Sequence, residues 1–217
     1  MINLGEYAMY FNIDKINEVF KKEPNDMQRR VLDSKKRVVV IGSQPGAGST
    51  VALFLKLAEE LYQSKNNFGV YLKFENSNLP NEFINGGKKS KTSDIIKFKY
   101  KGKKIKIKIA DVEWFDQLDY IPITAVSKQV FRNSNPEKLI NVMNCSGKVL
   151  IETSCSQLKE TNLHIKLGLY DEGKWSNHVD FFIGLTSGNN YLTQSYIKCL
   201  ESLNESDYNR LMDVDFN

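Results

Sequence analysis

A strand of the buried type that runs through a glycine-containing turn into a helix is the feature that most constrains the fold of this chain. Residues 38–41 are three valines and an isoleucine, a continuous apolar run typical of strands covered on both faces of a parallel sheet. A turn of small residues follows over 43–50, and residues 51–63 are rich in leucine and alanine, which favours a helix. This order of strand, turn and helix predicts the opening of an α/β domain.

The turn has the character of a phosphate-binding loop. Glycines between a buried strand and a helix let backbone N–H groups point toward an anion, and the helix N-terminus adds favourable partial charge. The P-loop pattern is GxxxxGK[ST], in which the lysine reaches the phosphates and the hydroxyl binds magnesium. Here Gly48 and Thr50 match, whereas Ser43 replaces the first glycine and Ser49 replaces the lysine. The candidate cofactor-binding residues of the loop are Gly46, Ala47, Gly48, Ser49 and Thr50.

This incomplete pattern leaves two interpretations open. The segment is either a tight strand-to-helix turn that holds no ligand, or a loop that keeps residual nucleotide binding. Because the phosphate lysine is missing, the sequence favours the absence of a bound cofactor. Weak binding of ATP with magnesium is the alternative, and no catalytic residue is assigned.

The rest of the chain repeats short apolar strands separated by helical segments. This alternation predicts an α/β fold in which a mainly parallel sheet is flanked by helices, in the manner of a P-loop NTPase. No internal repeat or low-complexity linker interrupts it. The further strands are expected at 70–74, 148–153 and 180–185, and the further helices at 136–143 and 192–203.

The N-terminal part differs from the remainder in being amphipathic and polar. Its apolar residues recur at helical spacing up to a break at Pro24, and a second helix is expected over 26–33. We therefore divide the chain into an N-terminal helical extension over 1–36 and a degenerate P-loop NTPase-like domain over 37–217.

The positive charge of the chain is concentrated in one segment. The whole chain has a formal charge of +4, yet residues 88–108 hold ten lysines and one acid, Asp94, and so carry +9. Within this segment, apolar residues alternate with lysines over 96–100 and 104–109, on either side of Gly102. A period of two predicts a β-hairpin with one apolar face and one lysine face.

The lysine face of this hairpin is the most distinctive candidate for a partner surface. Its positive potential would attract an acidic protein, a nucleic acid or an anionic lipid surface. The structural alternative is that lysines on edge strands prevent aggregation through unpaired backbone groups. Phe98 and Tyr100 fall on the apolar face by alternation, so base stacking is poorly supported. The candidate partner-binding residues are Lys97, Lys99, Lys101, Lys104, Lys106 and Lys108.

Several segments resemble one family of nucleotide-binding proteins. Residues 39–61, VVIGSQPGAGSTVALFLKLAEEL, resemble the opening of the MinD/ParA group of P-loop ATPases, whose deviant motif KGGVGK[ST] precedes a helix of the type TVALNLAxxL. Residues 185–203 resemble a later MinD stretch that reads VTTPEPTSLTDAYxxIKxL, and residues 149–153 fall where the family has its Walker B strand. The most similar branch is the flagellar-number-regulating MinD-like ATPases, some of which carry a DQAxxLR helix whose glutamine corresponds to Gln28.

The departures from this family bear most directly on function. Carried across residue by residue, the signature lysine becomes Gln44, the phosphate lysine becomes Ser49, and the Walker B aspartate becomes Glu152. Two further acids become Phe74 and Asn76. Phosphoryl transfer depends on positioning and on neutralising developing charge, which these changes remove. The resemblance thus implies a MinD/ParA-like fold with a degenerate nucleotide site, a catalytically inactive pseudo-ATPase in which Glu152 is a further candidate nucleotide-binding residue.

The resulting hypothesis is a regulatory or positioning protein that acts through protein–protein contacts with a partner of acidic surface, and the family resemblance points to flagellar or cell-pole placement. The alternatives are a weak ATPase or GTPase switch, with magnesium held by Thr50 and Glu152, and a nucleic-acid-associated, degenerate RecA-like NTPase. No residues at metal-ligand spacing predict a metal site. No apolar run reaches the length of a membrane span, so a cytoplasmic protein is expected.

Overall fold

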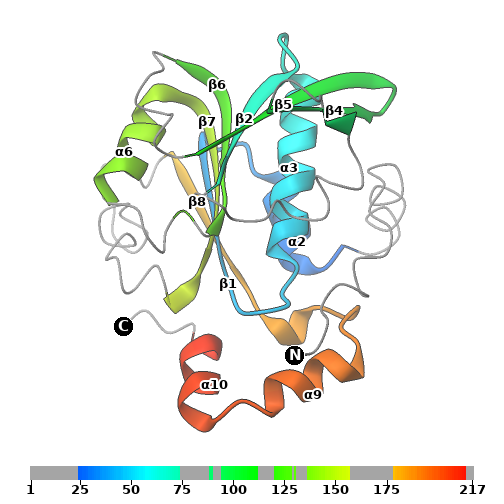
Figure 1. Ribbon diagram of the computed structural model, residues 1–217, viewed down its shortest axis with the longest axis vertical. Coiled ribbons are helices and arrows are strands. Elements are labelled where there is room, and N and C mark those ends of the chain that lie inside the picture. The colour runs from blue at the N-terminus through cyan, green and yellow to red at the C-terminus, as the bar shows by residue number, and fades with distance from the viewer. Residues whose placement is uncertain are drawn as a thin grey trace.

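The fold is built on an eight-stranded sheet with helices on both faces (Figure 1). The computed structural model describes residues 24–73, 88–89, 94–111, 120–128, 130, 136–156 and 178–213. The strands are β1 (Val38–Ser43), β2 (Phe68–Lys73), β3 (Lys88–Lys89), β4 (Ile95–Tyr100), β5 (Lys103–Asp111), β6 (Ile121–Val126), β7 (Ser146–Ser154) and β8 (Val179–Gly184). The helices are α2 (Asp26–Asp33), α3 (Ser49–Gln63), α6 (Pro136–Cys145), the 3-10 helix η3 (Thr186–Gly188), α9 (Gln194–Glu201) and α10 (Glu205–Met212).

The sheet is mainly parallel. Its strand order is β3-β4-β5-β2-β6-β7-β1-β8, and the six strands from β5 to β8 in this order all run parallel to their neighbours. Only β4 and β3, at one end, are antiparallel to their neighbours. The predicted α/β fold class, a mainly parallel sheet flanked by helices with a lysine-rich β-hairpin, is confirmed.

The position of β1 in the sheet determines which elements surround the loop that follows it. β1 lies between β7 and β8, and all six of its residues are buried. The predicted second strand, β2, is parallel to β1 but is separated from it by β6 and β7. The carboxyl ends of β7 and β8 are therefore the strand ends nearest to the loop.

Besides the two-residue β3, the strand β6 is absent from the sequence-based prediction. Pro122 lies inside it, and proline normally argues against an interior strand because it has no N–H to donate. Pairing with β2 begins only at Thr124, and the register with β7 passes from Ile121 to Ile123. The proline is tolerated because it lies near the start of the strand, where it has no partner in either register.

Two apolar cores lie on opposite faces of the sheet. α2 and α3 cover one face, where Leu53, Phe54 and Leu57 of α3 pack against Ile41 of β1 and Tyr71 of β2. α6 covers part of the other face, which is lined by the alternate residues of the same strands. In the described part of the chain, no helix combines the length and apolarity needed to cross a membrane.

A buried lysine of α3 fixes the end of α2. The ammonium group of Lys56 donates to the carbonyl oxygens of Leu32 (2.8 Å) and Ser34 (2.6 Å). It also forms an ion pair with Glu60 (2.9 Å), which in turn pairs with Lys148 of β7. Burial lowers the pKa of Lys56. These contacts fix the end of α2, while Asn25 and Gln28 at its start bond to the loop that follows β1.

The helix predicted over 26–33 is α2, and its contacts with α3 make it part of the domain core. Residues 1–23 of the predicted N-terminal extension lie outside the described residues. The division of the chain at residue 36 stays a prediction.

Candidate phosphate-loop site

The candidate site is the tight loop between β1 and α3. Gly46 (φ 76°) and Gly48 (φ 84°) both adopt left-handed backbone conformations, which glycine reaches without steric cost. Gly48 is the N-cap of α3, and Ser49 and Thr50 form the first turn of that helix. The structure therefore brings the predicted loop residues, Ala47 included, into a single strand-to-helix turn.

Side chains from α2 and η3 hold the loop by its carbonyl groups. Four successive carbonyl oxygens each accept one hydrogen bond from a side chain that is distant in the sequence. Pro45 O accepts from Thr186 Oγ1 (2.7 Å), Gly46 O from Asn189 Nδ2 (2.6 Å), Ala47 O from Asn25 Nδ2 (3.1 Å) and Gly48 O from Gln28 Nε2 (3.2 Å). These four side chains therefore fix the conformation of the loop.

The backbone amides at the start of α3, unlike the loop carbonyls, have no hydrogen-bond partner in the described part of the chain. The first N–H groups of a helix have no intrahelical acceptor. The amides of Gly48, Ser49 and Thr50 donate to no acceptor in the described part of the chain. Backbone amides at a helix N-terminus are suited to binding an anion, so the loop retains this one element of a phosphate site.

A buried cluster of three hydroxyls and a carboxylate lies beneath the loop. Glu152 of β7 is 2% exposed, and its Oε1 accepts hydrogen bonds from Ser49 Oγ (2.8 Å) and Thr50 Oγ1 (2.7 Å). Ser43 Oγ donates to Ser49 Oγ (2.8 Å). The residue at the position of the phosphate lysine is therefore a neutral donor to an internal carboxylate, and the candidate magnesium hydroxyl of Thr50 is bonded to the same oxygen.

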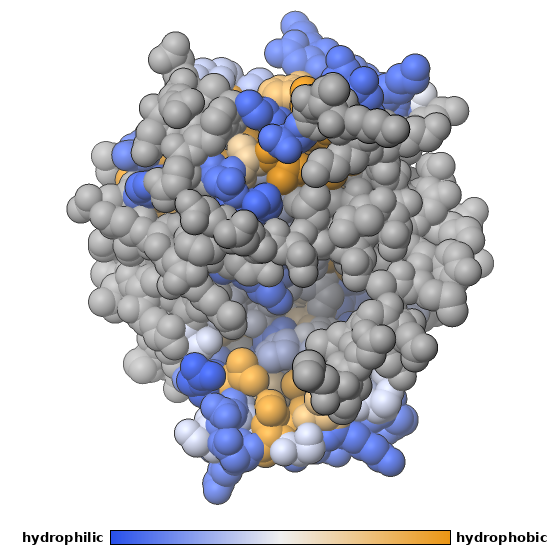
Figure 2. Space-filling view, in the orientation of Figure 1, coloured by the Kyte–Doolittle hydropathy of each residue, from blue (hydrophilic) through white to orange (hydrophobic). Residues whose placement is uncertain are grey.

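The segment after β8 covers the loop on another side. A Cβ atom on Gly46 would lie 2.7 Å from Tyr196 Cε1 and 3.0 Å from Leu192 Cδ2. Burial raises the pKa of the Tyr196 phenol. Figure 2 shows hydrophobic residues gathered between α9 and α10 with hydrophilic residues at their borders, and no residue of either helix is fully buried.

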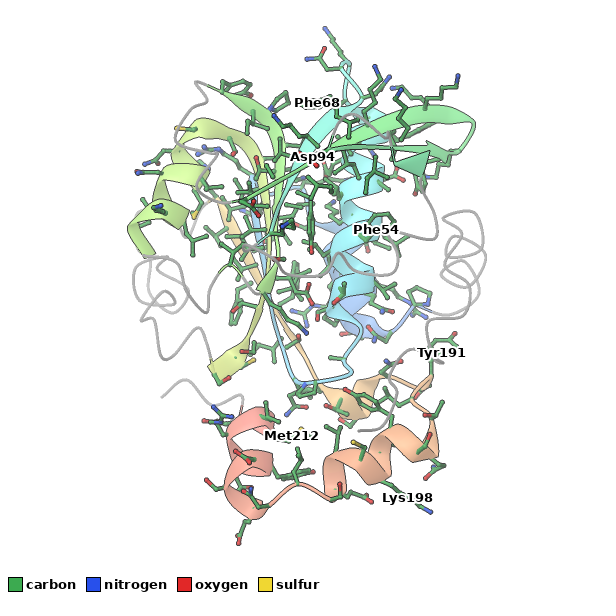
Figure 3. The ribbon with its side chains drawn as sticks, viewed as in Figure 1. Phe54, Phe68, Asp94, Tyr191, Lys198 and Met212 are labelled. Atoms are coloured by element: carbon green, nitrogen blue, oxygen red, sulfur yellow. The ribbon has the colours of Figure 1, made fainter. Side chains whose placement is uncertain are left out.

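Gln44 ties the loop to this C-terminal segment. Its Nε2 donates to Met212 O (2.5 Å), and its Oε1 accepts from the backbone N–H of Thr186 (2.8 Å). Figure 3 shows Met212 on the side of α10 that faces the rest of the domain. Gln44, which the resemblance to the MinD/ParA ATPases aligns with their signature lysine, thus makes contacts within its own chain.

Some residues that surround the loop were not predicted as site residues. Asn25 and Asn189 donate to loop carbonyls across large sequence separations, which no local pattern reveals. The signal for Asn25 was its capping box with Gln28, which marks the start of α2. Ser127, which follows β6, has a buried hydroxyl without a hydrogen-bond partner in the described structure. Of the remaining residues carried over from the family, Phe74 and Asn76 lie outside the described residues.

The lysine hairpin lies at the far end of the sheet from β1. Lys97, Lys104 and Lys106 are exposed, and Lys108 is half-buried. Lys101 forms an ion pair with Glu59 of α3 (2.6 Å), and the predicted turn at Gly102 has a φ of 79°. Lys99 lies opposite Lys104 in the strand register. Lys101 is exposed as well, but its ammonium group is engaged with α3.

A metal site is not formed by the described residues, among which no group of three or more His, Cys, Asp or Glu side chains is arranged to hold an ion. The candidate site thus consists of a loop held by side-chain donors, a buried carboxylate and a row of amides.

Comparison with known proteins supports the fold alone. No protein-family model matches the chain, and no curated protein matches it. Among solved structures, the large terminase from the thermophilic bacteriophage D6E is similar with a TM-score of 0.59 and 11% identity, covering 86% of this chain and 52% of the terminase. The Phi-28 gp11 DNA packaging motor is similar with a TM-score of 0.50 and 12% identity, covering 89% of this chain and 69% of the motor. The chain spans about half the length of the terminase, and the similarity to both structures is one of fold.

Proposed function

We propose that this chain is a P-loop-type protein that does not hydrolyse nucleotide and that acts by binding partner proteins, in a regulatory or positioning role. The resemblance of residues 39–61 to the MinD/ParA ATPases supports a positioning role of that kind, at the flagellum or cell pole, and a cytoplasmic location. The fold is compatible with this proposal, because a P-loop arrangement of β1 and α3 is retained while its charged groups are replaced.

The observation that carries the proposal is the bonding of Ser49. In an active P-loop, a lysine at this position neutralises charge on the transferred phosphoryl group. Here the side chain ends in an uncharged hydroxyl that donates to Glu152, and the residue is 6% exposed. An enzyme that loses such an electrostatic contact typically loses about 10²–10³ in rate, so the loop is not equipped for phosphoryl transfer.

A second candidate function is a weak nucleotide-dependent switch. The observation that favours it is the set of amides at Gly48, Ser49 and Thr50, which have no acceptor among the described residues. These amides could hold phosphate oxygens without the lysine. Against it, Thr50 already donates to Glu152, so magnesium would have to displace an internal hydrogen bond.

Isothermal titration calorimetry with ATP and with GTP, each with magnesium, distinguishes the two candidates. The proposal predicts no binding or a Kd weaker than about 1 mM, equivalent to a binding free energy of about −4 kcal/mol. A micromolar Kd that is lost in a Thr50→Ala variant would favour the switch. The variant is needed because it assigns any observed binding to this loop.

A further inference from the structure

The β4–β5 hairpin presents a group of exposed lysines that the loop and its chemistry do not use. We define the lysine face as Lys97 of β4 with Lys104 and Lys106 of β5. All three side chains are exposed, and none forms an ion pair with an acid in the described part of the chain. Figure 2 shows hydrophilic residues at the upper right of the molecule, where the hairpin lies in Figure 1.

The register of the strands places like charges directly opposite one another. Lys97 is the partner of Lys106 across β4 and β5, and Lys99 is the partner of Lys104. On the other side of β4, Lys97 is also the partner of Lys88 of β3. Directly opposed like charges destabilise a sheet. An arrangement of this kind is stabilised when an anion lies across it.

Protection of a sheet edge does not account for all of these lysines. Lys106 of β5 pairs with Phe68 of β2 on one side and with Lys97 of β4 on the other, so the backbone there is already paired. Lys104 precedes the first residue of β5 that pairs with β2, and Lys97 belongs to β4, near the edge of the sheet. The edge explanation therefore covers at most Lys97 and Lys104.

The geometry of the lysine face suits an extended array of anions. Residues two apart along a strand lie about 6.7 Å apart, and neighbouring strands lie about 4.8 Å apart. Lys104, Lys106 and Lys108 thus form a row along β5, with Lys97 beside its middle member. The row continues the sheet face that carries Val70 of β2, opposite to the face packed against α3.

The composition of the face identifies the kind of polyanion. Residues 88–111 contain ten lysines and no arginine, and lysine is depleted from protein–protein interfaces whereas arginine and aromatic residues are enriched. Insertion into a lipid surface needs exposed apolar groups, but the large exposed hydrophobic residues of the described structure are Tyr120, Leu185 and Tyr191, outside the hairpin. Single-stranded nucleic acid is bound through aromatic platforms, and Tyr100 is buried.

We propose that the lysine face binds the phosphate backbone of a nucleic acid duplex without regard to sequence. Lysine acts as a point charge on phosphate oxygens, and contacts of this kind position the duplex but do not read its bases. This goes beyond the proposed function of the loop and does not depend on nucleotide.

The salt dependence of duplex binding tests the proposal. Each phosphate contact contributes about 0.9 to the slope of log K against log salt concentration. In fluorescence anisotropy with a labelled 20-base-pair DNA and no nucleotide, the Lys97→Gln, Lys104→Gln, Lys106→Gln triple variant should show a slope smaller than wild type by about 2.7. Between 50 and 200 mM salt, the affinity of wild type should fall about 40-fold more than that of the variant.

A second triple variant, Lys35→Gln, Lys128→Gln and Lys198→Gln, is the matched control, since it removes the same charge from exposed lysines outside the hairpin. It should keep the wild-type slope, and two duplexes of unrelated sequence should bind equally. Equal slopes for the two triple variants, or no duplex binding by wild type, would overturn the proposal. Binding to phosphatidylserine vesicles or to an acidic polypeptide in preference to the duplex would also overturn it. Circular dichroism confirms that each variant is folded.

Discussion

Ser49 determines the chemistry at the start of α3. In the P-loop pattern, this position holds a lysine whose charge reaches bound phosphates. The serine side chain is shorter than lysine, and its hydroxyl donates to Glu152 beneath the loop. Thr50 donates to the same oxygen. The carboxylate therefore serves as an internal acceptor that holds the first turn of the helix.

Replacement of Glu152 by alanine should lower the free energy of unfolding by about 1–3 kcal/mol, because the buried hydroxyl of Ser49 and the half-buried hydroxyl of Thr50 lose their acceptor. Glu152→Gln keeps an acceptor oxygen and should cost less. Urea unfolding measures both changes, with the exposed Glu201→Ala as a control expected within about 0.5 kcal/mol of wild type. Equal destabilisation by alanine and glutamine would show that the acceptor role is unimportant.

The buried Lys56 should make stability depend on alkaline pH. Burial lowers its pKa in the folded protein from the ordinary value of 10.5, so between the folded pKa and 10.5 the unfolded chain binds more protons than the folded protein. Stability contributed by this group therefore rises with pH through that window. Urea unfolding should show that the free energy of unfolding of wild type, relative to that of Lys56→Met, increases as the pH rises toward 10.5. A difference that is constant with pH would contradict this.

The helices and strands around the loop supply the side chains that hydrogen-bond to it. β7 on one side of β1 supplies Glu152, and β8 on the other side leads into η3, whose Thr186 bonds the loop. α2 is held by Lys56 and supplies Asn25 and Gln28. The hydrogen-bond partners of the loop, the donors at α2 and η3 and the acceptor Glu152 of β7, come from three separate elements, so the conformation of the loop depends on the packing of all three.

Gly46 and Gly102, two of the three described glycines with positive φ, allow backbone strain alone to be compared with backbone strain combined with a steric clash. Gly102→Ala meets no atom within 4 Å, so it should cost about 1–2 kcal/mol for the left-handed backbone. Gly46→Ala adds a contact at 2.7 Å with Tyr196 and should cost more. Thermal or urea unfolding measures both.

A Gly46→Ala, Tyr196→Ala double variant removes the clash. Its loss of unfolding free energy should be smaller than the sum of the losses of the two single variants, since the effects of residues in contact are not additive. Strict additivity would show that α9 does not rest on the loop. Gly102→Ala combined with Tyr196→Ala is the matched pair and should be additive, because nothing lies near Gly102.

In the molecule as a whole, the main concentration of positive charge lies far from the loop between β1 and α3. The positive charge lies on the hairpin at one end of the sheet, and the loop lies at the carboxyl end of β1 near the other. Among the candidate partner residues, Lys101 forms an ion pair with Glu59, which attaches the hairpin turn to α3. Two regions with different chemistry can therefore be tested independently.

Most of the fold was predictable because local patterns determine it. The valine run of β1, the leucine-rich α3 and the alternation of β4 and β5 each appear in the sequence at nearly their observed bounds. β6 was missed because Pro122 argues against a strand, and the strand order was not predicted because parallel pairing joins residues far apart in the chain. The donors Asn25 and Asn189 were missed for the same reason.

The most direct test of the central claim is phosphate release from ATP with magnesium by the purified full chain. The bonding of Ser49 and Thr50 to Glu152 predicts no release above the buffer rate, with or without duplex DNA. Release that rises with protein concentration and disappears in Thr50→Ala would contradict the claim, because it would place catalysis in this loop.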